Sequence, residues 1–277
     1  MGTDTRLTPK QIKEFQRTVY DHYRDNGRTL PWRKTEDPYA ILVSEIMLQQ
    51  TQVARVIDKY EQFINTFPDI ESLAQTPLRE VLRLWQGLGY NRRALFLKKC
   101  AEEVTSQFHG IIPDHARELI KLPGIGAATA GAVCAYAFNQ PVVYIETNIR
   151  TVYIYHFFKD VEKVNDGDIK PLVSETLDKD NPRRWYNALM DYGVELKQLH
   201  ANPSQKSSHY QKQSPFKGSN RQVRGAILKK MTTVERLPRQ ELSDSLPFDR
   251  EIIEENIMGL EQEGLIVVTE GDEIAIL

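Results

Sequence analysis

The sequence predicts a mainly α-helical fold with a small C-terminal part that also contains strands. Apolar residues recur three or four positions apart through residues 8–200, whereas no stretch there alternates convincingly between apolar and polar residues. Glycine and proline mark the joins between the helical stretches. Over the last residues, 265–277, apolar residues instead form two short runs around a Gly-containing turn, a pattern typical of two strands.

Helix boundaries in the body follow from local signals. Thr8-Pro9 supplies an N-cap and a proline at the first helical position, and Asn26-Gly27 ends that helix. Asp37-Pro38 opens a helix that runs to about Phe67, with a break near Gln50-Thr51. Further helices are expected near residues 69–75, 77–84, 91–108, 114–121, 127–138, 148–158, 168–178 and 181–197.

The tail is predicted to be a separate, winged-helix-like module. Asn220–Met231, Arg239–Leu246 and Asp249–Gly264 are expected to be helices, followed by the two strands. Residues Asp249–Glu263 are rich in glutamate, whereas winged-helix DNA readers generally carry positive charge on the recognition helix. We therefore expect a packing or partner-binding role for this helix.

Composition places the chain among soluble globular proteins. The 277 residues are 40% hydrophobic and 27% charged, and no run is long and apolar enough to span a bilayer or to serve as a signal peptide. The two cysteines, Cys100 and Cys134, lie in helical apolar patterns and are expected to be buried thiols. Two cysteines cannot build a disulfide framework or an all-cysteine metal site, so we expect a cytoplasmic location.

The net charge of −2 conceals an uneven distribution. Residues 235–277 carry 12 acidic and 3 basic side chains, so the rest of the chain is net positive. Between Leu196 and Val234 there is no aspartate or glutamate but there are eight lysines and arginines. This basic run indicates either contact with a polyanion or a solvated linker.

The stretch Leu122–Val133 predicts a site for an anion. Gly124 and Gly126 precede a helix, but their spacing fits neither the dinucleotide fingerprint nor the phosphate loop of nucleotide hydrolases. The stretch is therefore helix, tight turn, helix. A helix N-terminus with close backbone approach suits a single backbone phosphate of DNA, although a purely structural turn stays open.

Two carboxylates are the candidates for chemistry. Glu45 lies in an apolar helix stripe, where partial burial is expected to raise its pKa and suit it to act as a general acid. Glu146 follows an apolar run at a helix start, with Asn148 beside it. One neutral and one ionised carboxylate form the pair that glycoside cleavage requires. The alternatives are an arginine-paired helix residue for Glu45 and a helix cap for Glu146.

Several segments then match a known family in its own order. They are Leu30-Pro-Trp-Arg33, Asp37-Pro-Tyr39, Ser44-Glu-Ile-Met-Leu-Gln-Gln-Thr-Gln-Val53, Leu84-Trp-Gln-Gly-Leu-Gly-Tyr90, Leu122-Pro-Gly-Ile-Gly-Ala-Ala-Thr-Ala-Gly-Ala132 and Met190-Asp-Tyr-Gly193. Over about residues 8–195 the chain resembles the helix-hairpin-helix DNA glycosylases of the endonuclease III superfamily, and most closely the MutY-type adenine DNA glycosylases.

The resemblance implies a two-lobed helix-hairpin-helix glycosylase domain over residues 1–200. One lobe covers about 36–138 and the other 1–35 plus 139–200. A basic linker at 201–219 and the winged-helix-like domain at 220–277 follow.

The resemblance also implies base flipping and assigns roles. Glu45 matches the general acid, Gln50 the side chain that fills the gap in the base stack, and Tyr90 the wedge beside the opposing base. Arg28 and Asp191 fall near contacts to the extruded base. Gly124 and Gly126 match the phosphate site, and a monovalent cation on the carbonyls of residues 122–127 stays open. The remaining matched positions at the DNA interface are Trp32, Arg33, Gln49, Leu122, Ala128 and Thr129.

Four departures from the family pattern qualify these expectations. Glu146 stands where the family has an aspartate. Ala128 occupies the position of the Schiff-base lysine, so we expect a monofunctional enzyme without β-lyase activity. The cluster cysteines are missing, so no cofactor and no iron–sulfur cluster are expected. The C-terminal module that reads 8-oxoguanine is also missing, and the acidic winged-helix-like tail stands in its place.

Three functions follow from the resemblance. The first is removal of adenine opposite 8-oxoguanine or guanine, and the second is removal of thymine or uracil opposite guanine. The third is a catalytically silent protein that binds DNA lesions. Each has double-stranded DNA with a mismatched or damaged pair as its partner, and the family default is a monomer.

Overall fold

The computed structural model describes residues 7–277, which form two compact units. The first unit comprises the described chain up to Ile41, together with Asp114–Ile120 and Ile125–Lys212. The second comprises Leu42–Pro113, Lys121–Gly124 and Gln213–Leu277. The chain therefore passes between the units more than once.

The first unit is helical. It contains α1 (Pro9–Asn26), the 3₁₀ helix η1 (Pro31–Arg33), α7 (Ala116–Leu119), α8 (Ala127–Phe138), α9 (Thr147–Phe157), α10 (Asp166–Thr176), α11 (Pro182–Leu199) and the 3₁₀ helix η2 (Pro203–Lys206). The predicted start of α1 is confirmed, because the Thr8 side chain accepts a hydrogen bond from the Gln11 backbone in a capping box.

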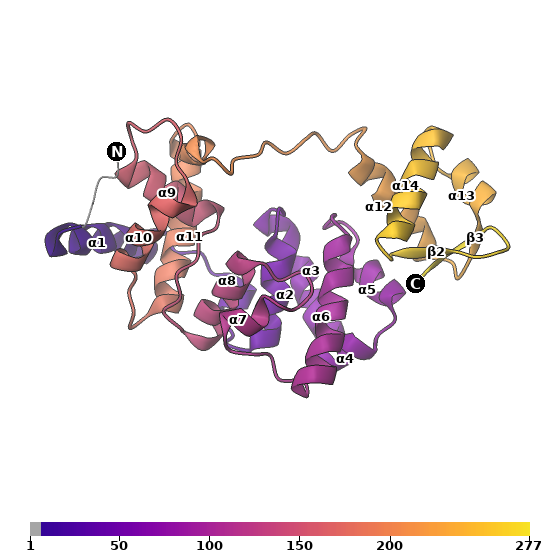
Figure 1. Cartoon of the computed structure of the whole chain (residues 1–277), viewed down its shortest axis with the longest axis horizontal. Coiled ribbons are helices and arrows are strands. Elements are labelled where there is room, and N and C mark those ends of the chain that lie inside the picture. The colour runs from indigo at the N-terminus through magenta and orange to yellow at the C-terminus, as the bar shows by residue number, and fades with distance from the viewer. Residues whose placement is uncertain (1–6) are drawn as a thin grey trace. The chain divides into compact units, whose positions relative to one another are not determined.

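The core of the first unit lies between α1, α9 and α11. Trp185, Tyr186 and Tyr153 are fully buried, and the ring of Phe15 lies 5.3 Å from that of Tyr153. Helices α9 and α11 pack side by side (Figure 1). Gly193 permits this close packing, since a Cβ atom there would lie 2.5 Å from the carbonyl oxygen of Asn148.

The second unit begins within α2. It contains α2 (Pro38–Leu48) from Leu42 onward, α3 (Val53–Thr66), α4 (Ile70–Gln75), α5 (Leu78–Trp85), α6 (Arg92–Phe108), α12 (Asn220–Met231), β1 (Leu237–Pro238), α13 (Arg239–Ser245), α14 (Arg250–Gln262), β2 (Ile266–Val268) and β3 (Glu273–Ile276). The predicted break near Gln50-Thr51 is confirmed, because α2 ends at Leu48 and α3 begins at Val53.

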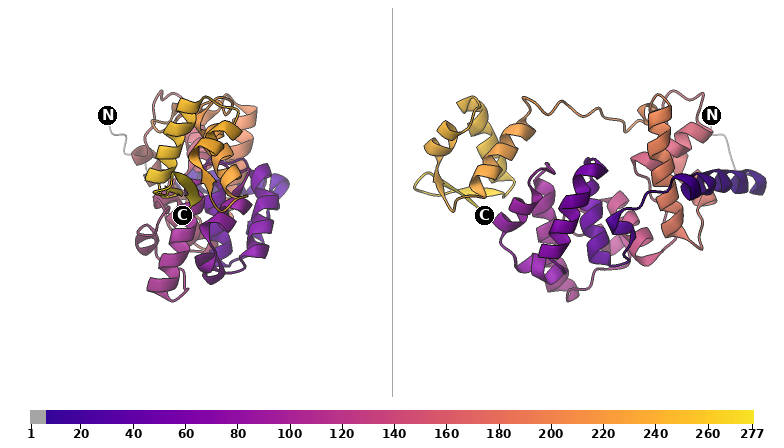
Figure 2. Two further views of the ribbon diagram at one scale, coloured as in Figure 1. Left: turned by 90° about the vertical axis from the view of Figure 1, so that its right-hand side faces the viewer. Right: turned by 180° about the vertical axis from the view of Figure 1, so that it is seen from behind.

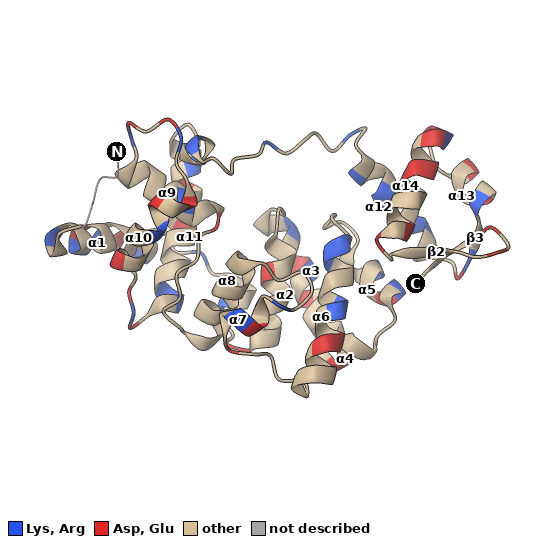
Figure 3. Ribbon diagram, in the orientation of Figure 1, with Lys and Arg blue, Asp and Glu red and all other residues tan. Residues whose placement is uncertain are grey.

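The C-terminal part has the helices and strands expected of a winged-helix-like module. Helices α12, α13 and α14 accompany an antiparallel sheet of order β1-β3-β2. Figure 2 shows this C-terminal part, coloured orange to yellow, from two further sides. Strand β1 was not predicted, because two residues are too few for an alternating pattern. Helix α14 packs against α12 and β2, and Figure 3 shows its acidic residues beside the basic residues of α12.

The two cysteines are buried free thiols, as predicted. Burial raises the pKa of Cys100 to about 12 and that of Cys134 to about 11, which makes both unreactive at neutral pH. Over residues 7–277, no helix combines the length and the apolar character needed to cross a bilayer.

Candidate active site

Glu146 caps the N-terminus of α9 with its own side chain. Its Oε1 atom accepts hydrogen bonds from the backbone N–H groups of Asn148 at 2.5 Å and Ile149 at 2.9 Å. Burial raises the pKa of Glu146 above its usual value, and the two N–H donors and the charge of Lys197 limit that rise. The carboxylate is thus fixed in orientation, as the predicted cap position requires.

Asn148 and Lys197 complete this part of the site. Lys197, on α11, donates from Nζ to Asn148 Oδ1 at 2.8 Å. Because lysine can only donate, this bond orients the amide, and Asn148 Nδ2 lies 3.4 Å from Glu146 Oε2. Burial lowers the pKa of Lys197, and the Glu146 charge counteracts that effect. Sequence reasoning missed Lys197, which lies 49 positions from Asn148.

Glu45 lies on α2 in the second unit. Its neighbours Ile41, Leu42 and Ile46 are buried, and Glu45 itself is half-buried. This placement agrees with the apolar stripe predicted from the sequence. A half-buried carboxyl on a buried helix is suited to donate a proton to a group that reaches it.

Arg28, Arg33 and Asp191 form one ion-paired cluster in the first unit. The Asp191 side chain is 1% exposed, and its oxygens accept from Arg28 Nε at 2.6 Å and from both terminal nitrogens of Arg33 at 2.7 and 2.8 Å. Burial alone would raise the Asp191 pKa, but Arg33 and then Arg28 hold it below its usual range. The Arg33 side chain is 10% exposed and that of Arg28 is 31% exposed.

This cluster fixes the connector between α1 and α2 onto α11. Trp32 is buried within the same connector. Since the arginines occupy both oxygens of Asp191, Arg28 is the member of the cluster with a side chain available to an external ligand.

The predicted hairpin turn between α7 and α8 presents an exposed helix N-terminus. Gly126 is the N-cap of α8 and contributes no side-chain hydrogen bond, and a Cβ atom there would meet nothing within 4 Å. Ala128 is exposed, whereas Leu122 and Thr129 are buried. The start of α8 is therefore open to an anion.

Gly124 meets a conformational requirement of the turn. Its φ of +77° lies in the left-handed region, and a Cβ atom there would lie 2.8 Å from the Cβ atom of Phe96. Glycine is thus needed at position 124 by the conformation and packing of the turn, whereas glycine at position 126 leaves the N-terminus of α8 accessible.

Gln50 and Tyr90 share an unusual backbone conformation in the second unit. Their φ angles are 53° and 48°, a left-handed conformation that non-glycine residues adopt rarely. Arg93 supports both turns, because its guanidinium donates to the carbonyl oxygens of Gln49 at 2.6 Å and of Gly89 at 3.0 Å. It also donates to Met47 O at 2.8 Å, near the end of α2.

Arg93 was also missed by sequence reasoning. Burial lowers its pKa to about 10, because carbonyl oxygens rather than a carboxylate surround it. Its partners lie more than 40 positions earlier in the chain as well as in the preceding turn, so no local pattern indicates the role.

Nine of the predicted site residues fall into three groups, and Glu45 belongs to none of them. Glu146 and Asn148 meet at α9, Arg28 and Arg33 meet at Asp191, and Gln49, Gln50, Tyr90 and Gly124 line one cavity in the second unit. Within residues 7–277, no three histidine, cysteine, aspartate or glutamate side chains are arranged to hold a metal ion.

Comparison with known proteins identifies the domain. A family model described as HhH-GPD superfamily base excision DNA repair protein matches residues 43–166. Residues 43–166 belong to this superfamily. The HhH-GPD domain includes Glu45, Tyr90, the hairpin turn and Glu146, so the recognition made from the sequence is confirmed.

Relatives and solved structures extend the match beyond the HhH-GPD domain. An adenine DNA glycosylase of Buchnera aphidicola is 40% identical over 194 residues, which cover 68% of this chain and 54% of that protein. The adenine DNA glycosylase of Rattus norvegicus is 40% identical over 147 residues, 50% of this chain and 28% of that protein. The chain spans about half or less of the length of the curated relatives it matches.

Two solved structures share the fold. A thermostable thymine-DNA glycosylase is 29% identical with a TM-score of 0.63, covering 67% of this chain and 87% of the other. A trapped endonuclease III–DNA intermediate is 21% identical with a TM-score of 0.55, covering 76% and 92%. The predicted mainly helical glycosylase fold is therefore confirmed.

Proposed function

We propose that this protein is an adenine DNA glycosylase that hydrolyses the N-glycosidic bond of a mispaired adenine in duplex DNA. One observation carries the proposal. Both candidate carboxylates, Glu45 and Glu146, lie within the HhH-GPD domain, and an adenine DNA glycosylase of Buchnera aphidicola is 40% identical over 68% of this chain.

The chemistry assigns one role to each carboxyl. The carboxylic acid of Glu45 protonates a ring nitrogen of the extruded adenine, so that the electrons of the breaking C1′–N bond leave with a neutral base. The Glu146 carboxylate stabilises the positive charge that develops on the sugar. A water molecule adds to C1′ and releases a proton, which leaves an abasic site.

Contacts with DNA follow from the exposed groups. The open N-terminus of α8 binds a backbone phosphate, and the guanidinium of Arg28 reaches toward the extruded nucleotide. Gln50 and Tyr90, presented by their left-handed turns, occupy the base stack.

The remaining expectations belong to the same proposal. The enzyme is monofunctional, because alanine at 128 offers no amine for a Schiff base. It carries no iron–sulfur cluster, because two cysteines cannot supply the thiolate ligands. We further propose that it acts as a monomer on cytoplasmic DNA that contains a mismatched or damaged base pair.

Thymine excision is the second candidate function. A specific observation favours it, since the thymine-DNA glycosylase structure covers 67% of this chain. Adenine remains preferred because an acid at position 45 has a basic ring nitrogen to protonate in adenine, whereas thymine offers none of comparable basicity.

Base excision on defined duplexes tests the proposal. The wild-type protein is incubated with duplexes that contain A·8-oxoguanine, A·G, T·G or U·G, and abasic sites are then cleaved with hot alkali. We expect strand breaks in the adenine-containing duplexes alone, and none before alkali.

The variant Glu45→Gln separates catalysis from binding. It should bind the duplex as tightly as wild type and excise on the order of 10²- to 10⁴-fold more slowly. Breaks restricted to T·G and U·G would favour the thymine function, and tight binding without any excision would favour a silent lesion binder. Breaks before alkali would refute the assignment of a monofunctional enzyme.

A further inference from the structure

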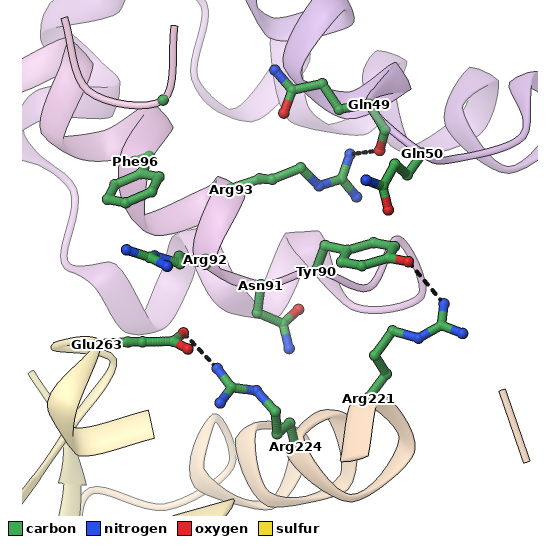
Figure 4. A pocket seen from close by; sticks show the side chains of 11 residues that line it. Gln49, Gln50, Tyr90, Asn91, Arg92, Arg93, Phe96, Arg221, Arg224 and Glu263 are labelled. Carbon is green, nitrogen blue, oxygen red and sulfur yellow. Dashed lines mark hydrogen bonds and ion pairs between the residues drawn. The ribbon is translucent and has the colours of Figure 1, made fainter. Parts of the chain in front are cut away.

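The side chain of Tyr90 is held by residues that lie far from it in the sequence. Its hydroxyl accepts a hydrogen bond from Gln213 Nε2 and another, at 3.1 Å, from Arg221 Nη1. Figure 4 draws the bond from Arg221. The Arg221 guanidinium also lies over the Tyr90 ring, 5.3 Å from its centroid, and Arg93 lies 5.6 Å from the same centroid. Both the polar and the aromatic part of Tyr90 are therefore occupied within the second unit.

The two arginines at Tyr90 are anchored differently. Arg93 lies on α6 beside the Tyr90 turn and donates to backbone carbonyl oxygens around the end of α2 and in the turn before α6. Arg221 lies on α12, 131 positions after Tyr90, and also donates to the carbonyl oxygen of Ser214. Across residues 7–277, Arg221 has no carboxylate partner. Arg93 is thus a fixed support of the turn, whereas the contact from Arg221 can be given up.

A cavity of about 460 Å³ lies between α6 and the C-terminal module, residues 220–277. It is lined from the α6 side by Tyr90 and Arg92 and from the module by Arg221 and Arg224. Protein interiors are packed too closely to leave a void of this size. In the part of the chain that the structure describes, no helix of the module packs along α5 or α6. The module therefore meets α6 through individual side chains and not through a shared core.

A further contact of the C-terminal module is also polar and exposed. Arg79, on α5, donates from Nη2 to the carbonyl oxygen of Glu235 at 2.8 Å. The bond from Gln213 to Tyr90 is exposed to water as well. Hydrogen bonds of this kind contribute little to stability, because water replaces each partner when the bond breaks. The module can therefore leave α6 at a small cost in free energy.

Tyr90 cannot keep its contacts with Gln213 and Arg221 and also enter a base stack. In the proposed function the Tyr90 ring lies among the bases of the duplex, so its face must be free of the Arg221 guanidinium. The arrangement in this structure and the DNA-bound one therefore exclude each other at this residue.

We propose that residues 213–231, the end of the acid-free run and α12, form a lid that covers Tyr90 in the free protein and leaves it when duplex DNA binds. We call these residues the α12 lid. The contact is autoinhibitory, because the apparent affinity for DNA is that of the open form reduced by the fraction of molecules that is open. The proposal rests on the proposed function only in taking DNA as the partner of Tyr90.

Gln213→Ala in the full-length chain is the first test. Gln213 is exposed and uncharged, so its removal weakens the α12 lid without changing the charge that attracts DNA. Duplex affinity should rise about threefold, because the loss of one such hydrogen bond enlarges the open fraction. Gln211→Ala is the matched control, since Gln211 is exposed in the same segment, and it should leave affinity unchanged. An affinity of Gln213→Ala equal to or lower than that of wild type would overturn the proposal.

Arg221→Ala compared with Lys229→Ala separates release of the α12 lid from loss of charge. Both variants delete one positive charge from α12, and Lys229 is exposed and does not line the cavity. Arg221→Ala should bind the duplex about threefold more tightly than Lys229→Ala, because it alone frees the Tyr90 ring. Equal affinities, or the reverse order, would show that Arg221 does not hold Tyr90 closed.

A double-mutant cycle tests whether Gln213 acts through the Tyr90 hydroxyl. Tyr90→Phe keeps the ring and removes the acceptor that Gln213 uses. Gln213→Ala should therefore add nothing to the affinity of Tyr90→Phe. A gain of the same size in both backgrounds would place the effect of Gln213 elsewhere and refute the lid.

Distances between spin labels measure the opening directly. Labels at Lys99→Cys of α6 and Lys229→Cys of α12 report movement of the α12 lid, since both positions are exposed and the native cysteines are buried. Saturating duplex should change the distance distribution, and Gln213→Ala should populate the DNA-bound distances without DNA. The control pair Lys229→Cys and Glu270→Cys lies within the C-terminal module and should keep one distribution. An unchanged distribution between α6 and α12 on DNA binding would overturn the proposal.

None of these readouts needs base excision. A protein whose α12 lid opens on the duplex but which excises no base would refute the proposed function and support the lid. A protein that excises adenine while the label distances stay unchanged would refute the lid alone.

Discussion

The N-termini of α8 and α9, both in the first unit, use the same backbone groups in different ways. At α9 the Glu146 side chain accepts from the N–H groups of the first turn, so the chain supplies its own anion. At α8 the N-cap is Gly126, which supplies none and leaves open space. One residue at the cap thus decides whether a helix N-terminus holds a carboxylate of its own or stays available for a phosphate.

The largest expected effect is on the rate of excision, when the Glu146 carboxylate at the N-terminus of α9 is changed. Glu146→Gln keeps the shape of the cap but removes its negative charge, so excision should slow on the order of 10²- to 10³-fold while duplex affinity stays unchanged. Glu146→Asp shortens the side chain and should also slow excision, since small displacements of a catalytic group are costly. Single-turnover rates measure both variants, and an unchanged rate for Glu146→Gln would remove this carboxylate from the chemistry.

The next largest effect, on duplex affinity, is expected when the N-terminus of α8 is given a capping carboxylate like that of α9. Gly126→Asp adds a capping carboxylate where the backbone is already extended and nothing lies within 4 Å. Duplex binding should weaken about tenfold, because the added carboxylate occupies the donors that a phosphate would use. Thermal unfolding should change little, since aspartate and glycine caps differ by only a few tenths of a kcal/mol.

Gly167→Asp is the matched control for that variant. Gly167 is exposed in the first turn of α10, and a Cβ atom there would also meet nothing within 4 Å. It adds the same charge at another helix start and should leave affinity within about twofold. If both variants weaken binding equally, overall charge rather than the α8 N-terminus governs the contact.

A smaller effect concerns the pH dependence of excision. Burial raises the Glu146 pKa, and the Lys197 charge opposes that rise, so Lys197→Met should raise the pKa further. Because the proposed role of Glu146 requires its ionised carboxylate, the acid limb of the single-turnover pH profile should move to higher pH. Lys197→Arg keeps the charge and should leave the limb closer to that of wild type.

Lys163→Met, at an exposed position in the same unit, should not move the acid limb at all. An acid limb at the same pH in Lys197→Met and wild type would show that Lys197 has no influence on the working carboxylate.

The same raised pKa has a consequence for stability. A carboxyl whose pKa is higher in the folded than in the unfolded protein binds its proton more tightly in the folded state. The contribution of Glu146 to stability is therefore lost as pH rises from the unfolded value, about 4.3, through the raised folded value. Glu146→Gln should lack this dependence when unfolding is followed against pH.

Local signals in the sequence predicted most helices but few of the contacts between them. Thr8-Pro9 gave the start of α1, and Gln50-Thr51 gave the break between α2 and α3, because caps and turns depend on adjacent residues. Arg93 and Lys197 could not be predicted, since each acts on groups more than 40 positions away. No periodicity encodes which carbonyl or amide a long side chain will reach.

The residues at the start of α9 also divide into those that local sequence predicts and a contact that it does not. The sequence placed Glu146 at a helix start and Asn148 beside it, which the structure bears out. The bond from Lys197 that orients the Asn148 amide depends on the packing of α9 against α11, where Gly193 leaves room for the Asn148 backbone. That packing is a property of the folded chain and not of either segment alone.

The most direct measurement compares Glu146→Gln and Gly126→Asp on one adenine-containing duplex, with affinity and single-turnover excision recorded for each. Glu146→Gln should bind like wild type and stay slow at any enzyme concentration. Gly126→Asp should bind weakly and regain the wild-type rate once enzyme is in excess over its Kd. If both variants lose only duplex affinity, or both lose only the excision rate, the N-terminus of α9 does not serve catalysis while that of α8 serves DNA contact.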